Sequence, residues 1–230
     1  MKCFLLSAAL LLLAASHSRA SLIVNGSFES FTISGLPNDF NWGPFITFFG
    51  PPETGGNTEL TGWTIAGNRG TNPNNVDLVN HILYAPFVGG WSLDMEGYDG
   101  ASGVIQQAFA TTVGGTYHLS FAYANNPEGG GAMANVLVTG LGILLNQDVS
   151  HNTSTYANLD YNLFAADFVA DSAITTLQFS ALTNTGKGIA LDAVSVDPVP
   201  EPSSALLLVL GLLGISAACK TGSYQRPKHK

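Results

Sequence analysis

The sequence predicts an all-β domain, built from two packed antiparallel sheets, between residues 21 and 198. Short runs of β-branched and aromatic residues recur there, separated by Gly, Asn, Pro and Asp, and helical periodicity is hard to find. About ten runs at this spacing are typical of a two-sheet sandwich. The 178 residues of this stretch are enough for one domain with its own core.

Ten runs are predicted as strands. In chain order they are Leu22 to Glu29, Gly62 to Ala66, Val76 to Val79, Trp91 to Glu96, Gly103 to Phe109, Thr116 to Ala124, Ala134 to Thr139, Tyr161 to Val169, Thr175 to Leu182 and Ile189 to Val196. In the fourth run, Trp91, Leu93 and Met95 are expected to face the core, because successive strand side chains point to opposite faces. In the last run, the adjacent Ala193 and Val194 break the alternation and predict a β-bulge.

Two stretches do not follow the strand pattern. Residues Thr32 to Leu60 are rich in aromatic residues, Gly and Pro, and are too long for a simple hairpin. Residues Ala124 to Ala132 form a second, Gly-rich loop, expected at one end of the sandwich. The acidic residues Asp94, Glu96 and Asp99 are expected on a solvated sheet face.

Both ends of the chain carry targeting features. Lys2, the apolar run Phe4 to Ala15 and the small residues Ser18 and Ala20 predict a secretory signal peptide, residues 1–20, with an uncleaved anchor as the alternative. Residues 199–230 begin with Val-Pro-Glu-Pro and continue with a charge-free run from Ser203 to Cys219. This order predicts a transmembrane helix, residues 203–219, followed by a basic tail, residues 220–230. The shortness of the run favours a transient stop over a permanent anchor.

The predicted exported domain is acidic and has no cysteine. It holds fifteen acidic residues against Arg69 and Lys187, a formal net charge of −13. Nucleic acid and anionic membrane surfaces are therefore poor partners, whereas neutral sugars and divalent cations are compatible; acidity that only keeps the protein soluble is the alternative. Cys3 and Cys219 lie outside the domain, and the lack of disulfides in an exported domain favours a bacterial origin.

The C-terminal residues Val199, Pro200, Glu201 and Pro202, followed by an apolar run and a basic end, closely resemble the PEP-CTERM sorting signal of Gram-negative bacteria that make exopolysaccharide. In that family a membrane protease-transpeptidase, the exosortase, is taken to recognise and process the segment. The resemblance implies export, transient residence in the inner membrane, and then delivery to the cell surface or extracellular matrix.

Seven motifs span nearly all of the predicted domain: Leu22-Ile23-Val24-Asn25-Gly26-Ser27-Phe28-Glu29, Gly62-Trp63-Thr64, Val76-Asp77-Leu78, Ser92-Leu93-Asp94-Met95-Glu96-Gly97, Gly103-Val104-Ile105-Gln106-Gln107-Ala108-Phe109, Tyr117-His118-Leu119-Ser120-Phe121-Ala122 and Ala190-Leu191-Asp192-Ala193-Val194-Ser195-Val196. Their order and spacing resemble the galactose-binding-like jelly roll found in anchored surface proteins and in plant cell-wall proteins of unknown function. The resemblance implies a jelly-roll sandwich and leaves the activity open.

Similar carbohydrate-binding jelly rolls often hold a structural calcium ion between the first and last strands, and Glu29 and Asp192 occupy the corresponding positions. Calcium prefers about six to eight oxygen ligands, which the two carboxylates and backbone carbonyls near Asn25 and Gly26 would supply in part. The alternative is that both acids cap turns or accept backbone hydrogen bonds.

Sugar binding by such domains needs an exposed aromatic ring that stacks on a pyranose, flanked by groups that bind hydroxyls. The candidates are Trp42, Tyr84 and Tyr98, with Asn125 and Asn126 as hydrogen-bonding partners. The other two tryptophans are expected in the core, from their positions in predicted strands.

The sequence does not contain the common catalytic motifs. There is no Gly-x-Ser-x-Gly, no His-Glu-x-x-His and no cysteine nucleophile, and the histidines lack metal-ligand spacing. We therefore expect a non-catalytic envelope or extracellular-matrix protein that binds polysaccharide. The alternative is a structural or adhesive surface protein that binds protein partners without recognising sugar.

Overall fold

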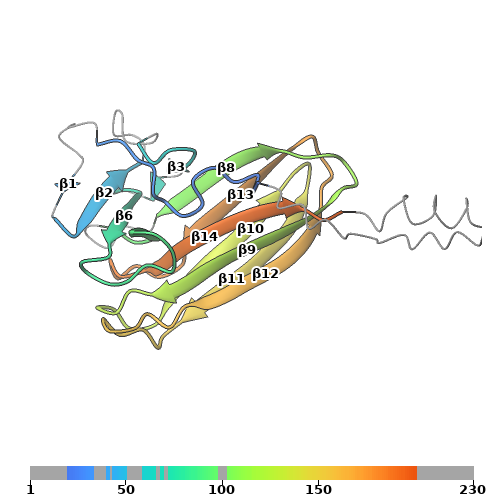
Figure 1. Cartoon of the computed structure of the whole chain (residues 1–230). Coiled ribbons are helices and arrows are strands. Elements are labelled where there is room, and N and C mark those ends of the chain that lie inside the picture. Colours follow the sequence, from blue (N-terminus) through green and yellow to red (C-terminus); the bar gives the residue numbers. More distant parts are fainter. Residues whose placement is uncertain are drawn as a thin grey trace, which may run out of the picture.

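The computed structural model describes residues 20–33, 40–41, 43–50, 59–65, 68–69, 72–97 and 103–200. Within them the chain forms strands and turns and contains no helix (Figure 1). No helix capable of crossing a membrane is found in these residues. The predicted signal peptide and the predicted transmembrane helix lie outside them. The all-β prediction is confirmed for the domain.

Two antiparallel sheets make up the domain. The seven-stranded sheet contains β1 (Phe40–Asn41), β2 (Phe45–Phe49), β6 (Asn75–Asn80), β7 (Trp91–Asp94), β9 (Thr116–Asn125), β12 (Asn162–Val169) and β14 (Ile189–Pro198), in the order β1-β2-β6-β7-β14-β9-β12. The five-stranded sheet contains β3 (Thr64–Ile65), β8 (Val104–Ala110), β10 (Ala132–Thr139), β11 (Ile143–His151) and β13 (Ile174–Ala181), in the order β11-β10-β13-β8-β3. A separate ribbon pairs β4 (Asn68–Arg69) with β5 (Asn72–Pro73).

Nine of the ten predicted strands are present, with ends that differ by a few residues. The prediction of a strand over Leu22 to Glu29 is wrong. Asn25 and Phe28 have positive φ angles of 56° and 59°, which turn the chain out of an extended conformation. The side-chain amide of Gln107 takes the place of a sheet partner there, because it bonds both the N–H (2.7 Å) and the carbonyl (3.0 Å) of Val24.

Five strands lie where none is predicted: β1, β2, β4, β5 and β11. β2 falls inside the stretch Thr32 to Leu60 and pairs along its whole length with β6. β11 carries consecutive polar residues in its centre, which hide its alternation. The predicted bulge in β14 is confirmed, since its register against β9 shifts between Asp192 and Ser195 and Ala193 has a φ of 51°.

The main hydrophobic core lies between the two sheets. Phe121 of β9 and Phe179 of β13 meet edge to face across it, with ring centroids 5.0 Å apart. Leu93 and Met95 are fully buried in the core, as the alternation in β7 predicts. Trp63 is buried beside Phe179, with ring centroids 6.2 Å apart. The inward faces of the strands therefore follow from period-two patterning.

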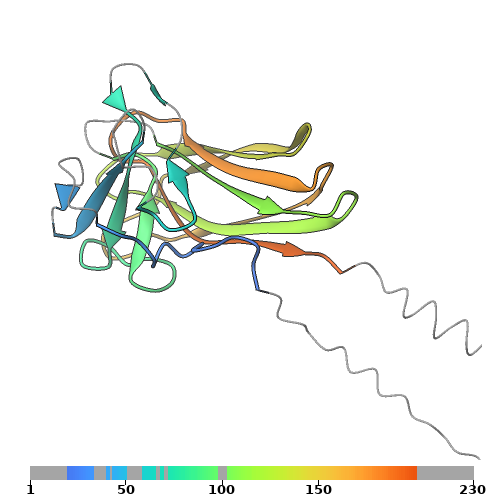
Figure 2. The same ribbon diagram turned by 90° about the horizontal axis from the view of Figure 1, so that it is seen from above.

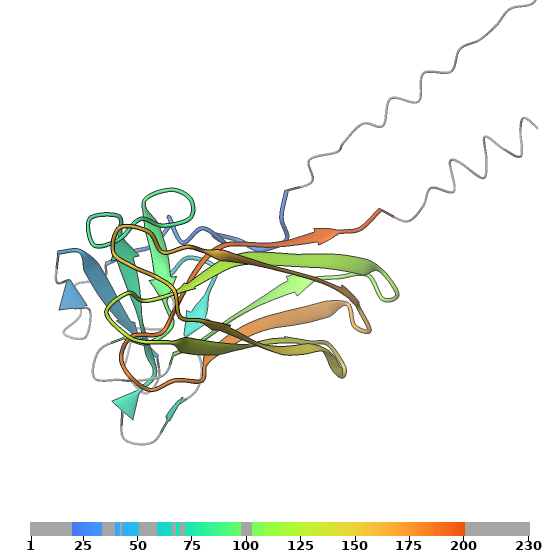
Figure 3. The same ribbon diagram turned by 90° about the horizontal axis from the view of Figure 1, so that it is seen from below.

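The long strands run between two ends of the domain, and the chain enters and leaves at the same one. Figures 2 and 3 show the β8–β9, β10–β11 and β12–β13 turns side by side at that end. The Leu22 N–H donates to the Val196 carbonyl (2.8 Å), which joins the first described residues to β14. We call this end, with turns 111–115, 140–142 and 170–173, the exit end. The opposite end, with segments 125–131, 152–161 and 183–188, is the loop end.

Candidate functional site

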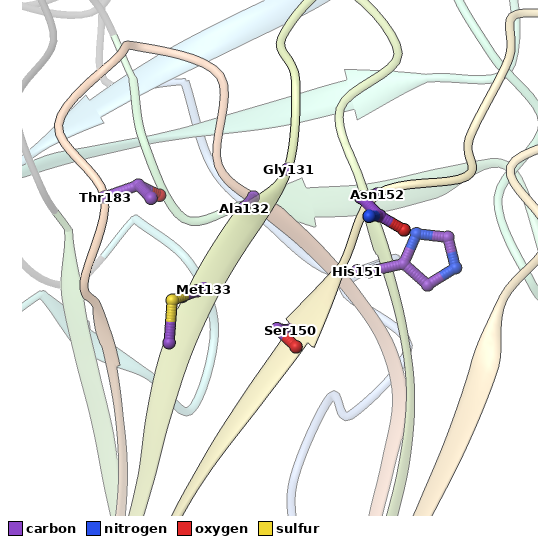
Figure 4. A pocket seen from close by; sticks show the side chains of 7 residues that line it. All are labelled: Gly131, Ala132, Met133, Ser150, His151, Asn152 and Thr183. Carbon is purple, nitrogen blue, oxygen red and sulfur yellow. The ribbon is translucent and has the colours of Figure 1, made fainter.

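A cavity of about 310 Å³ lies at the loop end, where β10 begins and β11 ends (Figure 4). Its lining consists of Gly131, Ala132, Met133, Ser150, His151, Asn152 and Thr183. This volume is near the lower limit for small-molecule sites. The cavity opens onto the outer face of the five-stranded sheet, because Met133 and its register partner Ser150 are both exposed.

The cavity combines apolar and hydrogen-bonding groups. The Met133 thioether supplies an apolar surface and is 40% exposed. Ser150 and Asn152 supply a hydroxyl and an amide, whereas the hydroxyl of Thr183 is buried. Figure 4 shows Met133 and Thr183 on one side of the hollow and Ser150 and Asn152 on the other, with the His151 ring turned away from Met133 and Thr183.

A row of polar side chains continues from the cavity along β11. Asn146, Asp148, Ser150 and Asn152 alternate with other residues and are all exposed. The Asn135 amide on β10 donates to Asn146 Oδ1 and Asp148 Oδ1, both at 2.7 Å, which fixes their orientation. We call these four residues the β11 polar row. Sequence reasoning misses both the row and the cavity, although the period-two polar pattern is readable once β11 is known to be a strand.

Asn125 lies behind the cavity and does not line it. The residue is buried, and its Oδ1 lies 2.7 Å from His151 Nδ1 and accepts the Ser154 N–H (3.0 Å). Its amide nitrogen donates to the carbonyls of Asn126 and Gly130. The expectation that Asn125 offers its amide to a ligand is wrong, because internal partners use both of its polar atoms. Instead, it positions His151 and the 152–161 segment.

Asn126 is buried as well. Its amide nitrogen donates to Asp94 Oδ2 (2.7 Å), and its Oδ1 accepts the Glu128 N–H (2.9 Å). The expectation that it binds a ligand is therefore also wrong. Asn126 joins the loop end to the buried carboxylate of β7.

Tyr84 does not form an exposed platform. Its side chain is 2% exposed and belongs to a small second core, together with Val79, Ala124, Leu159 and Ala190. Burial raises the pKa of its hydroxyl well above the usual range. The ring covers the outer face of the seven-stranded sheet, so the expectation of an exposed Tyr84 is wrong.

The acidic residues of β7 are buried rather than solvated. Asp94 and Glu96 are 1% and 0% exposed, because the small second core and the loop end cover this face. Burial raises the pKa of Asp94 to about 8. Glu96 Oε2 accepts N–H groups of Thr185 (2.7 Å) and Gly186 (2.9 Å), and its Oε1 has no hydrogen-bond partner within the described part of the chain. The expectation of a solvated acidic face is wrong for both residues.

Glu29 and Asp192 both accept hydrogen bonds from the loop that joins β6 to β7. Glu29 Oε1 accepts the N–H groups of Gly90 (2.8 Å) and Trp91 (3.0 Å), while Asp192 Oδ2 accepts that of Val88 (2.9 Å). Asp192 is buried, and none of the ion pairs among the described residues includes it. Burial raises its pKa to about 7.

The two carboxylates, when ionised, carry the charge that balances a divalent cation, but they supply few of the oxygen ligands that it needs. The Asn25 carbonyl already accepts Phe28 N–H (3.2 Å) and Trp63 Nε1–H (3.1 Å), and the Gly26 carbonyl accepts a backbone N–H at 2.9 Å. Two carboxylates offer at most about four of the six to eight oxygens that calcium prefers, so water and further carbonyls would have to complete the shell. The described residues hold no group of three or more acidic, His or Cys ligands.

Several predicted residues lie outside the described residues. They are Trp42, Tyr98 and Asp99 of the domain, and Glu201 and Pro202 of the sorting motif. Val199 and Pro200 are described, and the Val199 N–H donates to the Thr116 carbonyl (2.9 Å). The sorting motif therefore begins directly at the end of the sandwich.

A second hollow, of about 300 Å³, lies on the seven-stranded sheet between β9 and β12. Phe87, Leu163 and Ala193 contribute to a lining that is almost entirely apolar. The Phe87 ring is partly exposed and packs edge to face on Tyr161, with centroids 5.6 Å apart. The hollow offers an aromatic surface with one hydroxyl, that of Ser120, to orient a ligand.

Comparison with solved structures gives the fold. The structure of TmCBM61 in complex with β-1,4-galactotriose matches at a TM-score of 0.50 and 14% identity, over 79% of this chain and 100% of its own. A CBM4 structure matches at 0.41 and 16%, over 77% and 99%, and CBM35 from Paenibacillus barcinonensis at 0.40 and 18%, over 60% and 93%. The match to TmCBM61, together with the two antiparallel sheets, confirms the jelly-roll sandwich, whereas no curated protein matches the sequence.

Two family models match the sequence itself. The PEP-CTERM protein-sorting motif matches residues 198–220, which confirms the predicted sorting signal. The model described as a protein of unknown function, DUF642, matches residues 21–197. Because that model spans the whole sandwich and most of the chain, the protein belongs to the DUF642 family and carries a PEP-CTERM sorting motif directly after its family domain.

Proposed function

We propose that this protein is an exported, non-catalytic surface or matrix protein that binds polysaccharide through the cavity at the loop end. The observation that carries the proposal is the composition of that cavity, in which a partly exposed Met133 faces hydroxyl and amide groups. A pyranose ring has an apolar C–H face and a rim of hydroxyls, so it needs both kinds of group.

The position of the cavity supports the same proposal. It lies at the end opposite the point where the chain passes into the sorting motif, so a long ligand can approach it without meeting the exit end. The charge of the domain, −13, favours a neutral glycan over an anionic one.

The β11 polar row favours a polymer over a free monosaccharide. Side chains on one face of a strand recur about every 6.8 Å, so Ser150, Asp148 and Asn146 of β11, with Asn152 directly after the strand, offer hydrogen bonds over several sugar units. A ligand that fills the cavity with one unit can extend along this row.

Glycan-array binding of the full chain, followed by titration of the best glycan, tests the proposal. Met133→Ala and Asn152→Ala are expected to weaken binding about tenfold each, as removal of a packed or hydrogen-bonding contact does. Leu163→Ala, in the apolar hollow on the other sheet, is the matched control and should leave the affinity unchanged.

Two outcomes would contradict the proposal. If only the Leu163→Ala variant loses affinity, the ligand occupies the hollow beside Phe87 instead. If the array shows no glycan binding, the alternative of a structural or adhesive protein that binds protein partners is favoured.

We also propose that an exosortase-type membrane protease-transpeptidase processes the tail within or just after Val199 to Pro202. What supports this is the sorting motif and its direct attachment to β14. Mass spectrometry of the mature protein tests it. An intact C-terminus at Lys230 in cells that contain an exosortase would contradict it.

Finally, we propose that Glu29 and Asp192 take up a structural calcium ion. The support is that the buried Asp192 and the carboxylate of Glu29 accept hydrogen bonds from the same β6–β7 loop, and neither has a basic partner in the described segments. An ion there would join the first segment, the β6–β7 loop and β14.

A further inference from the structure

The exit end carries a group of exposed aliphatic side chains. They lie in the three hairpin turns, at the strand ends beside these turns and at the residue after β14, and their exposed fractions range from 37% to 86%: Val113, Leu141, Ile143, Val169, Ile174 and Val199. We call this group the apolar rim. Apolar side chains gathered at one place on a soluble surface mark contact with another molecule or a membrane.

Hydrogen bonds fasten the three turns to one another. The Gly114 N–H donates to the Ala170 carbonyl (2.8 Å), which joins the β8–β9 turn to the β12–β13 turn. The Asp171 carboxylate accepts the N–H groups of Leu141 (2.8 Å) and Gly142 (2.9 Å), which adds the β10–β11 turn. These hydrogen bonds hold the rim in one shape. Its side chains can therefore contact an apolar surface together without a further loss of backbone conformational entropy.

Charge is scarce at the exit end. Segments 110–116, 139–143, 169–174 and 195–200 contain Asp171 and Asp197 as their charged residues, although the domain carries fifteen acids. Both accept internal hydrogen bonds, Asp171 from the β10–β11 turn and Asp197 from the Ser195 hydroxyl (2.6 Å). The acidic character of the domain is therefore concentrated away from the rim.

The course of the chain indicates what lies next to the rim. Val199 is still bonded to the sandwich, through its N–H and the Thr116 carbonyl. The charge-free run from Ser203 to Cys219 begins four residues later. A run of this kind enters lipid, so it would hold the exit end at the bilayer surface with almost no linker.

We propose that the exit end is a membrane-contact surface, whose apolar rim enters the interfacial region of a bilayer while the C-terminal segment holds the chain there. Burial of aliphatic surface supplies the attraction, whereas anionic headgroups would oppose it because the domain is acidic. The contact would direct the loop-end cavity away from the membrane. The proposal does not depend on sugar binding, which the glycan array tests separately.

Site-specific fluorescence on the full chain in phosphatidylcholine vesicles tests the proposal. In a background with Cys3→Ser and Cys219→Ser, an environment-sensitive dye is attached at Leu141→Cys or at Ile82→Cys. Ile82 is the matched control, because it is 75% exposed but lies in the β6–β7 loop. We expect lipid-borne nitroxide to quench the dye at position 141 about fivefold more strongly than at position 82, and iodide to do the reverse.

A second variant checks that the rim itself makes the contact. With the dye at Leu141→Cys, Val113→Asp together with Ile174→Asp should reduce quenching by the lipid-borne nitroxide, whereas Leu163→Asp on the seven-stranded sheet should not. All variants must keep the melting temperature of the parent. Equal quenching at positions 141 and 82 would overturn the proposal, as would failure of the chain to float with the vesicles. Protection at position 141 that rises with the protein-to-lipid ratio would also overturn it, in favour of a second copy of the chain.

Discussion

The carboxylate of Asp171 accepts the backbone N–H of Leu141 at 2.8 Å, so one hairpin turn is fastened to another at the exit end. Gly140 makes this approach feasible, since a Cβ on it would lie 1.9 Å from Asp171 Oδ1. This is a contact between turns that are about thirty residues apart in the chain.

Replacing Asp171 with Ala should loosen the β10–β11 turn. We expect the free energy of unfolding to fall by about 1 kcal/mol, because two partly exposed hydrogen bonds to a charged group are lost. Hydrogen exchange at the Leu141 and Gly142 amides should accelerate. Asp148→Ala is the control, since that carboxylate accepts only a side-chain amide.

Gly140 and Asp171 should be energetically coupled. Gly140→Ala is expected to destabilise the parent by about 1–3 kcal/mol, because the new methyl group meets the Asp171 carboxylate, and to cost less in an Asp171→Ala background. A double-mutant cycle by urea denaturation measures this coupling. Strictly additive effects would show that the two residues do not meet in solution.

Removing the Glu96 carboxylate should destabilise the loop end. Its side chain is buried, and its Oε2 accepts the N–H groups of Thr185 and Gly186 in partly buried hydrogen bonds. We expect Glu96→Ala to lower the free energy of unfolding by about 3 kcal/mol. Glu128→Ala, which removes a partly exposed ion pair with Lys187, should cost less than about 1 kcal/mol and is the matched control. Equal losses would contradict the assignment of Glu96 as the clamp of the 183–188 segment.

Stability should fall as the pH rises from about 4 to 8. Burial raises the pKa of Asp94 to about 8 and that of Asp77 to about 6, whereas unfolded carboxyls titrate near 3.8. Above pH 3.8 the unfolded chain releases protons that the folded chain retains, so deprotonation favours unfolding until the folded pKa is passed. Each such proton contributes a slope of about 1.4 kcal/mol per pH unit.

Urea denaturation between pH 4.5 and 8, in the presence of a chelator, measures this slope. Asp94→Asn should reduce it, most clearly between pH 7 and 8, because Asp77, with a pKa of about 6, and Asp192, with a pKa of about 7, have largely titrated there. The control is Asp148→Asn, an exposed carboxylate on β11. A slope that Asp94→Asn leaves unchanged would mean that Asp94 is ionised in the folded chain.

Calcium should stabilise the folded chain if Glu29 and Asp192 bind it. At a concentration one hundred times the dissociation constant, the melting temperature should rise by roughly 5–10 °C. Asp192→Asn should abolish the response, and Glu128→Gln, at an acid remote from the pair, should retain it. A melting temperature that neither calcium nor chelator changes would leave the backbone hydrogen bonds of Val88, Gly90 and Trp91 as the role of the two acids.

The local patterns in the sequence predict most of the sandwich. Period-two alternation identifies β7, β9 and β14 and their buried residues, because the two faces of a strand meet different surroundings. It fails at Leu22 to Glu29, where Asn25 and Phe28 turn the chain, and at β11, where the edge position allows polar residues on both faces.

The site residues were predicted less well, for a reason that Asp94 illustrates. Alternation places its side chain on the face of β7 opposite Leu93, which is correct, but it does not reveal what covers that face. The same holds for Tyr84, Asn125 and Asn126, since each is a polar residue in a loop or at a strand end whose packing depends on distant segments.

The sequence by itself determined the all-β class, the inward residues of the long strands and the PEP-CTERM sorting motif, because each depends on the order of neighbouring residues. Only the tertiary structure decided which polar groups are buried and which side chains gather at each end. Asp171 meets Leu141, and Met133 meets Ser150, through strand pairing and packing between segments far apart in the chain. Such contacts depend on the whole fold, so the residues of a single stretch of sequence do not predict them.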